Sequence, residues 1–155
     1  KNKKVSYSVS VRVNNGAAEV AVYPTKISDI SNYWKSLDGE LAIKRNQILL
    51  GTNLTGENAA TASSSYPPPS NSPNSPNEPP IQKITFDYMG ALQTGVSGAP
   101  PSVNPPLTIV TGVPAGNSNN PNPSTKRCVQ VTTILGSISI GRGQYDATNN
   151  PGGCR

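Results

Sequence analysis

A strict alternation of apolar and polar residues near the start of the chain is the strongest constraint on its fold. In the run VSYSVSVRV, residues 5–13, every second residue is apolar, with serines and Arg12 between them. The apolar residues that share one face are Val5, Tyr7, Val9, Val11 and Val13. A period of two predicts a half-buried β-strand, because successive side chains of a strand point to opposite faces. The turn sequence Asn14–Gly16 and the run EVAVY, residues 19–23, then predict a β-hairpin.

Further short β-like runs follow along the chain. We expect strands at Gln47–Leu50, at 81–90, at 107–113, and in a closing hairpin at 129–140 that turns near Leu135–Gly136. In the run IQKITFDYMG, residues 81–90, the core candidates are Ile81, Ile84 and Phe86, and Gly90 turns the chain. These runs predict a mainly β fold of antiparallel sheets in a single domain, residues 1–155.

One segment has the spacing of a helix. Its apolar residues are Ile27, Ile30, Tyr33, Trp34 and Leu37, with Ser28 or Ser31 as the N-cap and Gly39 as the end. Apolar residues three and four apart predict a short amphipathic helix. We expect Tyr33, Trp34 and Leu37 to anchor the core rather than to form a binding surface.

Long segments have no periodicity at all. Residues 56–80 are rich in Pro, Ser and Asn, and the whole chain holds 16 prolines and 14 glycines. Such a composition predicts an extended or disordered surface loop. Two shorter loops of similar character are expected at 95–106 and 115–125.

The two cysteines, Cys128 and Cys154, do not have the spacing of a metal site, and the chain contains no histidine. We therefore expect a disulfide that fastens the C-terminal hairpin, and with it an oxidising compartment. In the loop-entropy model, closing a loop of this length destabilises the unfolded chain by about 3.5 kcal/mol.

Charge and residue types argue against an enzyme. Without histidine the chain lacks the usual triads and imidazole ligands, and its eight acidic residues are thinly spread. No catalytic residue, metal or cofactor is predicted. The net charge of +5 favours anionic partners only as a weak, nonspecific field.

Two blocks of sequence stand out, ITFDYMGALQTG, residues 84–95, and LTIV followed by RCVQVTTILGSISIGRG, residues 127–143. In this order they resemble the GspH/FimT family of minor pilins and pseudopilins. The resemblance implies the β-rich head of a type IV pilin-like subunit or a type II secretion pseudopilin. Such a subunit acts in filament assembly, and its partners are other pilins and the assembly machinery.

The same resemblance implies a hydrophobic, N-methylated N-terminal helix that anchors the subunit in the inner membrane before assembly. This stalk is not in the sequence, and Lys1, Lys3 and Lys4 resemble its last turn. The expected location is the periplasm, or the bacterial surface within the pilus. The cysteine pair resembles the disulfide-bounded C-terminal region of many pilins.

Two alternative functions stay open. Some members of the family bind DNA and carry a G-R-x-R end motif, of which Gly141–Gln144 matches only the first arginine. Arg142, with Lys126, Arg127 and Arg155, is therefore a candidate DNA or anion contact. The second alternative is an adhesin or glycan-binding domain that would use Tyr66, Tyr88 and Tyr145 as stacking residues.

Overall fold

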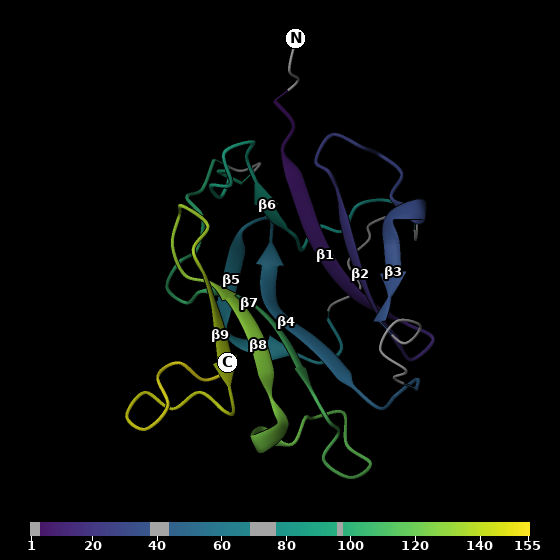
Figure 1. The fold of residues 1–155 in the computed structure, drawn as a ribbon, viewed down its shortest axis with the longest axis vertical. Helices are drawn as coiled ribbons and strands as arrows, with labels where there is room; N and C mark the ends of the chain where they lie inside the picture. Colours follow the sequence, from purple (N-terminus) through teal and green to yellow (C-terminus); the bar gives the residue numbers. More distant parts are fainter. Residues whose placement is uncertain (1–3, 38–43, 69–76, 96–97) are drawn as a thin grey trace.

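The computed structural model describes residues 4–37, 44–68, 77–95 and 98–155, which form two antiparallel β-sheets (Figure 1). Sheet A has the order β3-β2-β1-β6, with strands β1 Tyr7–Asn14, β2 Ala17–Pro24, β3 Trp34–Ser36 and β6 Ile84–Phe86. Sheet B has the order β5-β4-β7-β8-β9, with strands β4 Leu49–Gly56, β5 Ala59–Ser65, β7 Leu107–Gly112, β8 Arg127–Val131 and β9 Ile138–Arg142. The predicted mainly β, antiparallel fold is confirmed.

The predicted N-terminal hairpin is also confirmed, and Val11 of its apolar face is buried, but the serine face is buried more deeply than the alternation suggests. Ser8 and Ser10 are buried, whereas Tyr7 and Val13 are exposed. On the serine face Ser10 lies opposite Ala21 and Ser8 lies opposite Tyr23. Ala21, Tyr23 and Ile30 form a buried cluster, with Ile27, Tyr33 and Trp34 packed against it. The buried serine hydroxyls form hydrogen bonds with other hydroxyl groups. The hydroxyl oxygens of Ser10 and Tyr23 are 2.9 Å apart, and those of Ser8 and Thr85 are also 2.9 Å apart.

The α-helix predicted across Ile27–Gly39 is wrong over residues 27–36, of which 27–30 are irregular. Residues Ser31–Tyr33 form a single 3₁₀ turn, and Trp34–Ser36 continue as β3, which pairs with β2. Edge pairing with β2 gives these residues backbone hydrogen bonds that override their helical spacing. Tyr33 and Trp34 do pack against the core, as expected; Gly39 lies outside the described residues.

The loop predicted over residues 56–80 is in part a strand. Residues Ala59–Ser65 form β5, which pairs with β4 despite a sequence of Ala, Thr and Ser. The pairing is irregular, with register shifts on both sides of Leu54. Another expectation also fails: Ile81 is 49% exposed and does not belong to the core.

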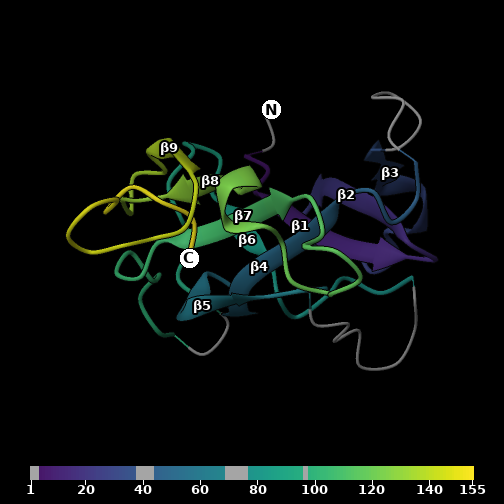
Figure 2. The same ribbon diagram turned by 90° about the horizontal axis from the view of Figure 1, so that it is seen from below.

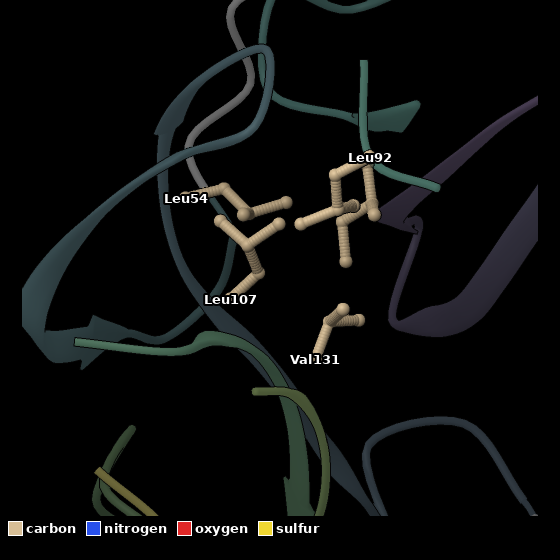
Figure 3. Packing of buried hydrophobic residues seen from close by; sticks show 5 residues of the cluster. Leu54, Leu92, Leu107 and Val131 are labelled. Atoms are coloured by element: carbon tan, nitrogen blue, oxygen red, sulfur yellow. The ribbon is translucent and has the colours of Figure 1, made fainter. Parts of the chain in front are cut away.

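The main core lies where the two sheets meet. It consists of Leu54, Leu107 and Val131 from sheet B, Ile84 from β6 of sheet A, and Leu92 from the segment that follows β6 (Figure 3). In both ribbon views β4 and β1 lie near the middle, and β9 and β3 lie at opposite sides (Figures 1 and 2). The edge strands β9 and β3 are therefore the parts of the two sheets that lie farthest apart.

A buried amide, that of Asn58, helps to join the sheets. Asn58, in the turn between β4 and β5, donates from Nδ2 to the carbonyls of Thr85 (2.9 Å) and Gln93 (2.7 Å). Its Oδ1 accepts from the Thr85 N–H at 2.8 Å, and its own backbone N–H donates to Lys83 at 3.0 Å. Asn58 is 1% exposed and has a φ of 52°, a left-handed conformation that Asn tolerates better than most residues.

We expect Asn58→Ala to lower the free energy of unfolding by about 3 kcal/mol or more, because three buried backbone groups lose their partner. Urea unfolding followed by circular dichroism measures this. Asn15→Ala is the matched control, since Asn15 has a similar φ of 49° but is exposed. An equal loss in both variants would assign the effect to backbone strain rather than to the buried amide.

Candidate functional site

An apolar row on sheet A extends from the core to the surface. Cross-strand register places Val9 opposite both Val22 and Ile84, so these three side chains share one face. Exposure rises across the sheet, from 4% at Ile84 to 9% at Val11 and 55% at Val22. The face that begins in the main core is therefore open to solvent at β2.

Sheet B shows the same gradient on the face that meets sheet A. Leu50, Leu107 and Val131 are buried, but Val129 is 46% exposed. On the edge strand β9, Ile138 and Ile140 are 63% and 74% exposed, and they pair with Val131 and Val129.

We call the uncovered residues of these two sheet faces the open apolar face: Tyr7, Val13, Val22, Val129, Ile138 and Ile140. Single exposed apolar residues are common, but rows of them continuous with the core indicate an interaction surface.

Two of the four predicted basic residues are brought together beside this face. Arg127 and Arg142 are directly opposite in the β8–β9 ladder, on the same side as Val129 and Ile140. Both are exposed, and neither has a salt bridge within the described part of the chain. Like charges directly opposite on a sheet repel, so this pair would be stabilised by an anion.

The other two basic residues lie elsewhere. Lys126 is 6% exposed, and its Nζ lies 5.6 Å from the centre of the Tyr66 ring. Burial lowers the pKa of Lys126, so its ammonium does not belong to the exposed arginine surface. The Arg155 guanidinium stacks on Tyr145 at 3.7 Å from the ring centre.

The C-terminal segment covers the opposite face of sheet B. The predicted disulfide between Cys128 and Cys154 is present, with its Cα atoms 5.7 Å apart. Val110 and Tyr66 pack against it. Gly141 on β9 is required here, because a Cβ at this position would meet Cys128 Sγ and the Gly152 carbonyl at 2.6 Å. A disulfide of this kind is typical of an oxidising, extracellular or periplasmic compartment.

The three candidate tyrosines do not form a common surface for stacking. The Tyr66 hydroxyl is buried without a hydrogen-bond partner, and burial raises the pKa of Tyr66 to about 12. Tyr145 is covered by Arg155, and the Tyr88 ring lies beside the Lys4 ammonium.

Within the described ranges, no three His, Cys, Asp or Glu residues gather where a metal ion could be held. Nor does any helix of these ranges have the length and apolarity to cross a membrane. No family model, curated protein or solved structure matches this chain.

The enclosed Tyr66 hydroxyl gives a pH-dependent prediction. A pKa raised from 10.0 to about 12 means that folding favours the neutral phenol. The stabilisation of the folded state that comes from this neutral phenol is fully present below pH 10, and it is lost as the pH rises toward 12. We expect Tyr66→Phe to remove this part of the alkaline destabilisation and to be neutral or stabilising near neutral pH, because an unpaired hydroxyl is removed.

Urea unfolding of both proteins across this pH range, in the absence of free thiol, measures the effect. Tyr7→Phe, which changes an exposed tyrosine, is the matched control. Parallel stability curves for Tyr66→Phe and the parent chain would contradict the prediction.

Proposed function

We propose that this chain is the β-rich head of a minor pilin, from a type IV pilus or a type II secretion pseudopilus, with a structural role in filament assembly. The observation that carries the proposal is the open apolar face, which leaves Val22, Val129 and Ile140 in water. A pilin subunit needs such a surface, because its N-terminal helix must pack on the sheets of its head. The sequence blocks at 84–95 and 127–143 support the same family.

The arrangement of the C-terminal segment fits this role. The disulfide and Tyr66 pack against Val110, on the side of sheet B opposite to Val129 and Ile140. Fastening the chain end there leaves the open apolar face free for a helix. The proposed location is the periplasmic side of the inner membrane before assembly, and the filament afterwards. An enzymatic role is not part of the proposal.

The first test is the native full-length protein recovered from cells. We expect N-terminal sequencing and intact mass to show an N-methylated residue, followed by about 20 apolar residues. A product of an ordinary signal peptidase without this segment would contradict the proposal. In the full-length protein, Val22→Asp and Ile140→Asp should reduce incorporation into filaments severalfold. Val113→Asp, which changes a 49% exposed valine outside the face, should not.

A second candidate function is DNA binding for natural transformation, favoured by the opposed pair Arg127 and Arg142. Two exposed guanidiniums without acidic partners among the described residues are suited to phosphate oxygens. Arg155 lies on the C-terminal segment and is a weaker candidate, because its guanidinium is already stacked on Tyr145.

If this function holds, Arg127→Ala and Arg142→Ala should each weaken duplex DNA binding and reduce its salt slope by about one. Gel retardation at several salt concentrations measures both quantities. Arg45→Ala, which removes an exposed arginine before β4, is the matched control. If all three substitutions weaken binding equally, the DNA is attracted only by the net positive charge of the protein, and a DNA site at Arg127 and Arg142 is excluded.

A further inference from the structure

Two turns are locked together at the end of the molecule where the chain begins (Figure 1). One follows β6 and the other joins β8 to β9. The Leu92 N–H donates to the Ile134 carbonyl at 2.8 Å, and Gly136 lies so close to the Gly90 carbonyl that there is no room for a Cβ. The two turns therefore form one rigid projection.

Large apolar side chains extend from this projection into water. The most exposed are Leu135 at 81% and Met89 at 77%, followed by Tyr88 and Ile134 at 51% each. We call these four residues the apolar tip. Turns are normally rich in Gly, Pro, Asn, Asp and Ser, so four large apolar residues in two adjoining turns need a reason other than turn geometry.

The turns hold these side chains in place. The Asp87 carboxylate accepts hydrogen bonds from the backbone N–H groups of Met89 (2.8 Å) and Ala91 (2.9 Å). In the second turn the Thr133 hydroxyl oxygen accepts from the Ser137 N–H at 3.1 Å. The Asp87 carboxylate therefore forms hydrogen bonds within its own turn, and the side chains that extend into water are apolar.

Basic groups lie beside the apolar tip. The Lys4 ammonium lies 3.1 Å from the Tyr88 hydroxyl and 4.4 Å from the centre of its ring. Lys4 and Lys26 also line a hollow of about 590 Å³, together with Ser6, Thr25 and Gln93. Val5 and Pro24 complete the lining. The two lysines and the neutral polar side chains at this hollow can donate hydrogen bonds to phosphate oxygens.

We propose that the apolar tip inserts into the surface of a bilayer that contains acidic phospholipids, with Lys4 and Lys26 against the headgroups. Tyrosine and lysine beside protruding apolar residues are the chemistry of the membrane interface. Four side chains on two adjoining turns form a small surface, whereas a stable protein interface covers about 800 Å² on each partner. The proposal does not depend on the pilin assignment.

Vesicle flotation of the 155-residue chain tests the proposal. We expect binding to phosphatidylcholine vesicles that contain phosphatidylglycerol, and much weaker binding to phosphatidylcholine alone. Leu135→Ser and Met89→Ser should each weaken binding about tenfold, since each removes an inserted apolar side chain. Lys4→Gln and Lys26→Gln should weaken binding only to the anionic vesicles.

Ile140→Ser is the matched control, because Ile140 is 74% exposed on the open apolar face and not in the tip. Absence of binding to anionic vesicles would overturn the proposal. So would an equal loss for Ile140→Ser, which would place the membrane contact on the sheets. Self-association that Leu135→Ser abolishes, without vesicle binding, would show that the tip meets a second copy of the chain instead.

Discussion

The two sheets depend on one buried side chain, the amide of Asn58. It completes the hydrogen bonding of Thr85 on β6, an edge strand of sheet A, and of Gln93 beyond that strand, from the turn between β4 and β5 of sheet B. The neighbouring contacts reinforce this junction: Glu57 accepts from the Thr85 hydroxyl at 2.7 Å and forms an ion pair with Lys83. Polar groups buried this deeply are stabilising only when every one of them is paired.

This junction lies at β4–β5 and β6, and a second link is formed at the β1–β2 turn, where the Asn46 N–H donates to the Gly16 carbonyl at 2.9 Å. The main core fills the space beside the junction, and farther away Val22 of β2 and the isoleucines of β9 are not covered by any of the described residues. The disulfide stabilises the other side of sheet B, where the last residues cross β8 and β9. One side of the molecule is thus closed within the described residues, and the other presents an unfilled apolar surface.

Local signals in the sequence predicted local structure well. The alternation and the turn at Asn14–Gly16 gave the first hairpin, and the two cysteines gave the covalent link. Long-range packing could not be predicted from the sequence. The burial of the serine face of β1 depends on the packing of Tyr23 and Ile30 on that face. The small residues of β5 form a strand only because β4 supplies a partner. Arg142 and Arg127 were both candidate contacts from the sequence, Arg142 through a motif, but only the strand register shows that they lie directly opposite each other.

The position of the sulfur bridge has a mechanical consequence. A tensile load applied between the two ends of the chain passes from Cys154 directly to Cys128 and does not stretch the 26-residue interval between them. The second strand of the closing hairpin, β9, is therefore outside the path of the load. The fully stretched chain has an end-to-end length roughly 90 Å shorter than it would have without the disulfide. Under tension this end of the protein acts as a covalent stop.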